Sequence, residues 1–266
     1  MRQKHTICDF CTSDSWVVLS PIEQSIKRKI EAVGTPLKDW DIKINYGIKT
    51  GCNEAFIIST DKRNEILSNC KDADERKRTE ELIRPILRGR DIKRYGYEWA
   101  GLWLINTHNG IKGKIERIHI EDYPATKAHL NQYWDKIEHR ADQGDTPYNL
   151  RNCVYLEDFN KPKLFYADIT QHLNFCLCRD VMYCNNTTYF ITTDNERELR
   201  HLQKYLNSPL IDWYYKTLSV QLGEKAVRMF SIYVLEIPIP PIGEDNIYEA
   251  YHLNATEIAF IEGKEA

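Results

Sequence analysis

The chain has 266 residues, of which 42% are hydrophobic and 28% charged, and its formal net charge is −3. This composition is typical of a globular protein and excludes a disordered tail. The longest apolar runs, such as 56–58, have the length of a strand, which excludes a helix that spans a bilayer. The first residues lack the apolar segment of an export signal, so we expect a cytoplasmic protein whose eight cysteines are reduced thiols.

The first half of the chain predicts helices and strands in irregular alternation. A helix is expected to begin at Pro21 with Ser20 as its N-cap, because isoleucines follow at helical spacing. The next predicted elements, in chain order, are a strand at 42–46, a glycine-bounded loop at 47–51, a strand at 55–59, a helix over 61–87 that is broken near Asp72 and disturbed at Pro85, a strand at 97–106, and a helix after Pro124 that leads into a loop at 143–147.

The second half predicts strands first and helices later. Its predicted elements, in chain order, are strands at 163–169, 174–179 and 187–192, a helix opened by a capping box of Thr193 and Glu196 with Leu199, Leu202 and Leu206 on its apolar face, a helix at 211–218, a strand at 233–239 and a terminal helix at 250–261. This order favours the α+β class, with one mixed, bent β-sheet and flanking helices. We divide the chain into a helical lead-in at 1–34, a main domain at 35–242 and a short helical extension at 243–266.

Sequence motifs of the common catalytic classes are missing. There is no Gly-x-Gly, no Gly-x-x-x-x-Gly-Lys and no Gly-x-Ser-x-Gly, which excludes the dinucleotide fingerprint, the glycine-rich loop of a methyl-donor pocket, the P-loop and the hydrolase elbow. The Pro240–Pro241 pair lacks the flanking residues of an amino-methyltransferase motif, and no proline is followed by the aspartate common in restriction nucleases. We therefore predict no catalytic residue and no metal ligand in this chain.

Cysteines at metal-ligand spacing are the first exception to consider. The Cys8–Cys11 pair could bind zinc together with Cys176, Cys178 and Cys184. However, Cys176 and Cys178 alternate within a predicted strand, so their thiols share a face by strand geometry alone. Buried cysteines commonly fill cores as small apolar groups, and we favour that interpretation.

Four histidines lie among carboxylates and are the second exception. They are His108, His119, His129 and His139. Since His129 and His139 are ten residues apart on one predicted helix, they are too far apart to bind one metal ion. We interpret the group as a solvated polar face.

Basic side chains are concentrated between residues 76 and 94, where eight cations face three acids, giving 8 − 3 = +5. Four of these cations surround Gly89 in a predicted loop, and they are Arg88, Arg90, Lys93 and Arg94. Such cations can contact phosphates, and arginine can also bond to guanine. A charged surface that only aids solubility explains the charge equally well. The turn at 47–53 adds Lys49, Thr50 and Asn53, whose side chains can bond to phosphates or base edges.

Taken in order, these segments resemble the TaqI-like C-terminal specificity domain of type IIG restriction endonuclease–methyltransferases and related phage-defence methyltransferases. The matching segments are 34–37, Trp40, 47–56, 83–85, 87–92, 123–125, 148–151, 161–164, 206–208 and 237–240. The last two also resemble the specificity subunits of type I systems, but the long spacer helix of those subunits is missing. The resemblance extends over nearly the whole chain and implies that residues 35–242 form a DNA target-recognition domain.

The resemblance also implies a division of labour within a longer protein, of which this chain would be a fragment. An upstream methyltransferase would bind S-adenosylmethionine and flip the target adenine, and an upstream nuclease would need Mg²⁺. This chain would carry no cofactor and would select the sequence in double-stranded DNA. The residues expected to contact DNA are Lys49, Thr50, Asn53, Arg84, Arg88, Arg90, Lys93, Arg94, Asn149, Arg151, Gln171 and His172. Backbone shaping is the role expected of Gly47, Gly51, Gly89 and Pro162.

Two other functions stay open at this point. A divergent metal-dependent nuclease could use Asp91, Asp168 and Asp180, and it would cleave DNA without other domains. A docking module of a defence complex would bind another subunit and would have no affinity for DNA.

Overall fold

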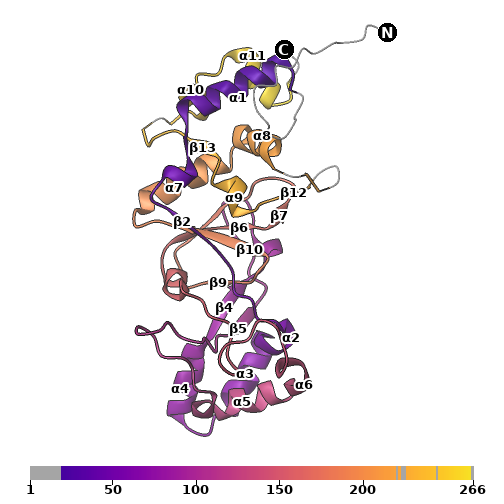
Figure 1. Cartoon of the computed structure of the whole chain (residues 1–266), viewed down its shortest axis with the longest axis vertical. Helices are drawn as coiled ribbons and strands as arrows, with labels where there is room; N and C mark the ends of the chain where they lie inside the picture. The colour runs from indigo at the N-terminus through magenta and orange to yellow at the C-terminus, as the bar shows by residue number, and fades with distance from the viewer. Residues whose placement is uncertain (1–18, 220, 223–225, 244, 265–266) are drawn as a thin grey trace, which may run out of the picture. The chain divides into compact units, whose positions relative to one another are not determined.

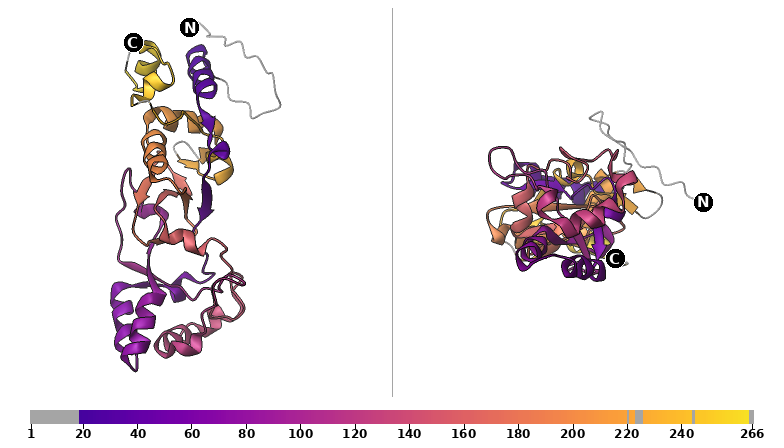
Figure 2. Two further views of the ribbon diagram at one scale, coloured as in Figure 1. Left: turned by 90° about the vertical axis from the view of Figure 1, so that its left-hand side faces the viewer. Right: turned by 90° about the horizontal axis from the view of Figure 1, so that it is seen from below.

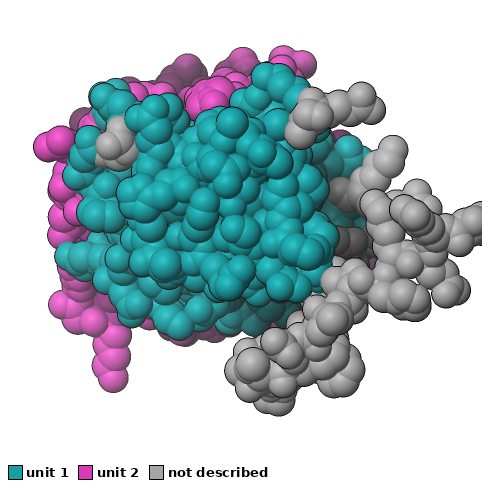
Figure 3. Space-filling view, turned by 90° about the horizontal axis from the view of Figure 1, so that it is seen from above, with its two compact units in different colours: residues 1–42, 170–173, 200–266 teal, residues 43–169, 174–199 magenta. Residues whose placement is uncertain are grey.

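The structure, a computed structural model, describes residues 19–219, 221–222, 226–243 and 245–264 (Figure 1). They form two compact units (Figure 3): unit 1 holds the residues up to 42 together with 170–173 and 200–266, and unit 2 holds 43–169 and 174–199. Cys8, Cys11 and the first part of the lead-in at 1–34 lie outside the described residues. The boundaries at 34/35 and 242/243 stay a prediction.

Unit 1 contains the predicted first helix, α1 (Pro21–Val33). Its N-terminus has a reciprocal capping box, in which the Ser20 hydroxyl accepts from the Glu23 amide and the Glu23 carboxylate accepts from the Ser20 amide. The carboxylate of Glu257, on α11 (Ala255–Ile261), accepts hydrogen bonds of 2.7 Å from both Ser25 and Lys29 on α1. A buried acid thus ties the first helix of the unit to its last.

The other elements of unit 1 are short. They are β1 (Thr35–Pro36), which pairs antiparallel with β13 (Pro238–Ile239), the single-turn 3₁₀ helix Leu37–Asp39, α8 (Pro209–Leu218), the antiparallel pair of β11 (Gln221–Leu222) and β12 (Ala226–Arg228), α9 (Ser231–Val234) and α10 (Ile247–Ala250). Helix α7 (Glu196–Leu206) and strand β7 (Ile169–Thr170) each cross from one unit to the other along the chain.

Unit 2 contains two four-stranded sheets. The first is antiparallel, in the order β2 (Lys43–Tyr46), β10 (Thr188–Thr192), β6 (Lys163–Ala167) and β8 (Cys176–Cys178). The second is mixed, in the order β3 (Ile57–Ser59), β5 (Leu102–Ile105), β4 (Ile83–Leu87) and β9 (Tyr183–Cys184), and only its β4–β9 pair is parallel.

Helices of unit 2 gather at one end of the unit, beside the mixed sheet (Figure 1, Figure 2). They are α2 (Asn53–Phe56), α3 (Thr60–Ser68), α4 (Ala73–Leu82), α5 (Pro124–Asn131) and α6 (Trp134–Ile137). Three single 3₁₀ segments, at Gly89–Asp91, Ile120–Asp122 and Leu156–Asn160, complete the unit.

Aromatic rings join the two sheets in the core of unit 2. Phe159 stacks on Tyr183 of β9 at 4.4 Å between ring centroids and contacts Phe190 of β10 at 4.7 Å. Phe190 in turn meets Phe165 of β6 edge to face, and all four rings are buried. Rings of this size bury much apolar surface, so this cluster holds both sheets in place.

The α+β class is confirmed, while the strands are divided among four sheets instead of one. The expected helix over 61–87 is wrong at its end, where residues 83–87 form strand β4. Pro85 has no N–H and cannot continue a helix, and its tertiary partner is β5. The strand expected at 55–59 begins with one helical turn, α2, and only its last three residues are extended.

Two other element predictions need correction. The helix expected to open at Thr193 begins at Glu196, where the Asn195 side chain accepts from the Arg197 amide at 3.0 Å and the Thr193 hydroxyl donates to Glu198. The segment at 233–239 begins with the last two residues of helix α9 and continues through a turn, and only Pro238–Ile239 is extended. In so short an apolar run, periodicity does not separate a helix from a strand.

None of the described helices is both long enough and apolar enough to cross a membrane.

A junction of backbone hydrogen bonds fixes three segments of unit 2 to one another. The Ile48 amide donates to the Cys184 carbonyl at 2.7 Å, and the Asn185 amide donates to the Leu87 carbonyl at 2.9 Å. Gly47 passes so close that an added Cβ would lie 2.1 Å from the Asn185 carbonyl oxygen. Only glycine fits there, which confirms its expected role in shaping the backbone.

We predict that Gly47→Ala lowers the free energy of unfolding by at least about 2 kcal/mol, because its Cβ meets backbone atoms that cannot move separately. Gly96→Ala is the matched control, since an added Cβ at Gly96 meets nothing within 4 Å. Chemical denaturation of both variants measures the difference. Equal stabilities would show that the junction tolerates a side chain.

Candidate nucleic-acid interface

Three polar segments leave the junction on the same side of unit 2. Strands β4 and β9 are parallel, and Ile48 forms a parallel bridge with Asn185. Parallel neighbours end at the same edge. The segments that follow, at 49–53, 88–94 and 186–187, therefore start together, although they lie far apart in the sequence.

A groove of about 740 Å³ lies where these segments meet, and we name it the loop groove. Its polar lining is contributed by Asn53, Glu54, Arg88, Arg90, Asp168, Asn185 and Thr187. Ile57, Leu102 and Ala167 contribute apolar lining. Both loops that the sequence singled out, at 47–53 and 88–94, thus contribute to one surface.

Hydrogen bonds hold one wall of the loop groove in place. The Thr187 hydroxyl accepts from the Gly89 amide at 2.9 Å and donates to Asn185 Oδ1 at 2.7 Å. A Cβ on Gly89 would lie 2.6 Å from the Thr187 carbonyl oxygen, so the two segments touch through their backbones. Asn185 and Thr187 were not expected from the sequence. A cluster of Asn and Thr residues at 185–188 was the available signal.

Arg88 is engaged within its own loop. The buried Asp91 carboxylate accepts from the Arg88 amide at 2.9 Å, from Nε at 3.1 Å and from Nη2 at 2.8 Å. This pairing raises the pKa of Arg88. Asp91 is only 5% exposed, so the arginine neutralises a charge that could not be buried alone. Arg88 therefore shapes the loop that presents Arg90.

Three cations of this loop are exposed: Arg90, Lys93 and Arg94. Lys93 and Arg94 lie on a tight hairpin, closed by backbone hydrogen bonds between Lys93 and Gly96 in both directions. Beside them Tyr95 is 62% exposed and has a left-handed backbone with φ of 72°. Exposed cations on a fixed loop are suited to phosphate contacts.

The turn at 49–53 is held from beneath by a buried arginine. Arg140, which is 5% exposed, donates from Nε to the Thr50 carbonyl at 2.8 Å and lies over the Phe56 ring at 4.6 Å. Burial lowers the pKa of Arg140 to about 10. Thr50 is itself buried and donates to Asn53 Oδ1 at 2.7 Å, while Asn53 is exposed in the groove. Lys49 is half-buried over the Tyr46 ring.

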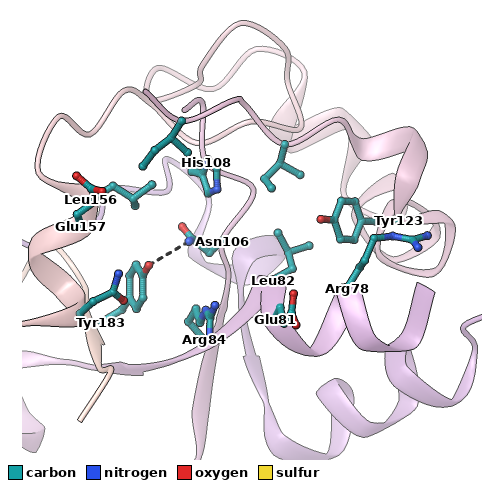
Figure 4. Close-up of a pocket in the computed structure, with 13 residues that line it drawn as sticks. Arg78, Glu81, Leu82, Arg84, Asn106, His108, Tyr123, Leu156, Glu157 and Tyr183 are labelled. Carbon is teal, nitrogen blue, oxygen red and sulfur yellow. Dashed lines mark hydrogen bonds between the residues drawn. The ribbon is translucent and has the colours of Figure 1, made fainter. Parts of the chain in front are cut away.

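Only Asn53, Arg88 and Arg90 of the predicted contact residues line the loop groove. Lys49, Thr50, Lys93 and Arg94 belong to the same two loops but not to its lining. Asn149 is buried and donates to the Ile118 carbonyl at 2.8 Å, which gives it a scaffolding task. Arg151 is exposed and pairs with Asp142 at 3.1 Å. Gln171 and His172 belong to unit 1, where His172 Nδ1 lies 3.1 Å from the Asp212 carboxylate. Arg84 lines a different pocket of unit 2 (Figure 4).

The three carboxylates of the nuclease alternative do not form one site. Asp91 is paired with Arg88, Asp168 lines the loop groove, and Asp180 accepts from the Tyr97 hydroxyl at 3.3 Å. Within the described residues, no group of three His, Cys, Asp or Glu side chains could hold a metal ion.

The cysteines and histidines have separate tasks. Cys176 and Cys178 alternate in β8 as expected, and both are buried. Burial raises the pKa of Cys176 to about 12, which disfavours the thiolate that a metal requires. The solvated-face interpretation is wrong for His129, which is 4% exposed with Nε2 3.0 Å from the Ala55 carbonyl oxygen. His119 and His139 are exposed.

Comparison with known proteins gives a family match over much of this region. Residues 84–239, more than half of the chain, match the TaqI-like C-terminal specificity domain. The type II methyltransferases M.PaeR7I of Pseudomonas aeruginosa and M.XhoI of Xanthomonas vasicola are each 22% identical to the chain over 231 residues, which is 86% of this chain. The chain spans only 37% and 39% of the length of these two relatives.

Two solved structures are similar to most of the chain. The type IIG restriction endonuclease BpuSI covers 91% of this chain with a TM-score of 0.49 and 12% identity, and 27% of its own chain is matched. The type IIL restriction-modification enzyme MmeI, solved in complex with DNA, covers 87% with a TM-score of 0.43 and 12% identity, and 34% of its own chain is matched.

We predict that Arg88→Ala and Arg90→Ala differ in stability. Loss of Arg88 leaves the buried Asp91 carboxylate without its cation and costs about 1–3 kcal/mol, whereas loss of the exposed Arg90 changes stability by less than about 0.5 kcal/mol. Thermal or urea unfolding of the two variants tests this. A stable Arg88→Ala variant would contradict the structural role of the pair.

Proposed function

The chain belongs to the family of TaqI-like C-terminal specificity domains, and we propose that it reads a specific sequence in double-stranded DNA for an adenine-specific restriction–modification enzyme. The observation that carries this proposal is the loop groove, where the turn at 49–53, the basic loop at 88–94 and the turn at 185–187 meet on one fixed junction. A protein that recognises a sequence in double-stranded DNA needs cations that contact phosphates and polar side chains that hydrogen-bond to base edges, both held on a rigid support.

The two kinds of contact would come from different parts of this surface. Arg90, Lys93 and Arg94 would bind phosphates, because they are exposed at the tip of a loop whose base is fixed. Asn53 and Thr187 would face base edges, where each good bidentate contact contributes about 1–3 kcal/mol of discrimination. The net charge of −3 does not argue against DNA binding. Salt screens distant charges, so the cations close to the bound phosphates determine the electrostatic attraction.

The longer protein would supply the chemistry. Both curated relatives are type II methyltransferases, and this chain spans less than two fifths of either. We propose that a methyltransferase domain outside this chain binds S-adenosylmethionine and flips the adenine, and that a fused nuclease domain with Mg²⁺ cleaves the DNA. Such an enzyme would act in the cytoplasm against phage DNA.

We predict that removal of any one exposed cation of the loop at 88–94 lowers both the affinity for DNA and the dependence of that affinity on salt. Arg90→Ala, Lys93→Ala and Arg94→Ala should each reduce affinity about three- to tenfold and lower the slope of log K against log salt by about 0.9, the value for one lost phosphate contact. Arg197→Ala, an exposed arginine of α7 outside the groove, is the matched control. Fluorescence anisotropy on a duplex between 50 and 200 mM salt measures both quantities. Equal losses in the control would sink the assignment of the loop.

Selection from a pool of randomised duplexes tests sequence reading. We expect the chain to enrich one short motif, and Asn53→Ala to relax the preference at one position while the salt slope stays unchanged. Binding without enrichment of any motif would show that the chain contacts the phosphate backbone but does not recognise a sequence. No binding at low salt would contradict the proposal and favour the docking module, and cleavage of the pool with Mg²⁺ would favour the nuclease.

A further inference from the structure

Unit 2 has a second concave site, the Asn106 pocket, which none of the DNA contacts proposed above explains. Its volume is about 290 Å³, and its labelled side chains converge from several elements (Figure 4). Asn106 follows β5, Arg84 lies in β4, Leu82 ends α4, and Tyr183 lies in β9. Residues of two strands, the residue that follows a third strand and the last residue of a helix thus contribute to the pocket.

Asn106 carries an unused hydrogen-bond acceptor at the centre of this pocket. The side chain is 5% exposed, and its amide nitrogen donates to the Tyr183 hydroxyl at 3.3 Å. The carbonyl oxygen Oδ1 is buried and has no hydrogen-bond partner. Buried polar atoms are normally paired, and an unpaired one destabilises a fold. A ligand that donates a hydrogen bond would satisfy Oδ1.

Side chains with hydrogen-bond donors also line the Asn106 pocket. Figure 4 shows Arg84 below Asn106 and His108 above it. The Arg84 guanidinium is half-buried, and the described residues offer it no ion pair within 4.0 Å. His108 Nδ1 accepts from the Gly110 amide at 3.2 Å, which leaves the ring proton on Nε2. Burial lowers the pKa of His108, so the ring is neutral at pH 7.

Apolar and aromatic side chains lie between the polar groups of the pocket lining. Tyr123 and Tyr183 lie on opposite sides of Asn106 in Figure 4, and Leu82 and Leu156 fill the space beside them. Tyr183 is fixed from behind by its stack on Phe159. Aromatic side chains with hydrogen-bonding groups between them are suited to a planar heteroaromatic ring whose edge carries a donor next to an acceptor.

A phosphate does not fit this arrangement. A phosphodiester carries acceptors alone and cannot satisfy Asn106 Oδ1, and any phosphate would meet the carboxylates of Glu81 and Glu157 in the same pocket. The polar edge of a nucleobase does fit, because adenine, cytosine and guanine each present a donor beside an acceptor.

We propose that the Asn106 pocket binds a nucleobase, whose donor bonds to Asn106 Oδ1 and whose acceptor faces the Arg84 guanidinium. The base comes either from a free nucleoside or from an unpaired nucleotide displaced from a duplex. The second source rests on the proposed DNA-binding function, and the first does not. This pocket is a binding site distinct from the loop groove.

The test uses the full chain with two kinds of probe. Adenosine, cytidine, guanosine and thymidine are titrated at millimolar concentration and followed by NMR. In parallel, a duplex with one bulged nucleotide and the same duplex fully paired are compared by anisotropy, with 2-aminopurine at the bulge. We expect one nucleoside to shift signals of the pocket, or the bulged duplex to bind at least tenfold more tightly than the paired one.

Asn106→Leu is the decisive variant, with Arg84→Met as the second. Asn106→Leu removes the unpaired oxygen and the 3.3 Å hydrogen bond to Tyr183 at similar volume. The two effects oppose each other, so we expect a small change in Tm together with at least a tenfold loss of nucleobase binding. Arg197→Ala, at an exposed arginine of α7 that lines neither site, is the control and should leave nucleobase binding unchanged. If Asn106 had only a structural role, the Asn106→Leu variant would have a lower Tm and the wild type would bind no nucleobase.

The outcomes separate the two sources and the two proposals. Binding of nucleosides alone assigns a free ligand, and preference for the bulge that Asn106→Leu abolishes assigns a displaced base. A wild type that binds neither nucleosides nor the bulge preferentially overturns the nucleobase site, even if it binds paired duplex. A wild type that binds nucleosides but no duplex supports the site while the proposed DNA-binding function fails.

Discussion

The backbone junction of unit 2 is the constraint on which the candidate interface depends. Hydrogen bonds from Ile48 to Cys184 and from Asn185 to Leu87 join three segments at the ends of their strands. The close passage of Gly47 leaves no room for adjustment. Since the polar loops begin at these residues, their relative positions are set before any side chain contacts a ligand. Loops on such a support can vary in sequence while the scaffold stays the same.

The charged residues of the basic loop fall into two groups. Some form ion pairs that hold the loop in shape, and others are exposed and can contact a ligand. Arg88 and Asp91 neutralise each other at low exposure, where an unpaired charge would be costly. Arg90 and Arg94 remain in solvent, where a cation keeps its hydration until a phosphate replaces it. The four cations around Gly89 thus have different roles although they are similar in sequence. The burial of each side chain, and not its residue type, determines whether it shapes the loop or can contact a phosphate.

The two surfaces that we propose for recognition differ in character, although they lie in the same unit. The loop groove is open and its exposed cations are screened by salt, so affinity there depends on ionic strength. The Asn106 pocket is small, has a neutral histidine and an unpaired oxygen, and depends on hydrogen bonds in a low-dielectric space. The first surface suits a polyanion and the second suits a single planar ring.

The sequence by itself determined the features that depend on neighbours along the chain. These include helix α1 with its Ser20 cap, the alternation of Cys176 and Cys178, the family match and the choice of two loops. Tertiary structure decided the rest. Residues 83–87 became a strand because β5 and β9 supply partners, and Thr50 and Asn149 became scaffold because they are buried. Asn185 and Asn106 gained their roles from segments up to a hundred residues away, since hydrogen-bond partners across such distances leave no periodic trace in the sequence.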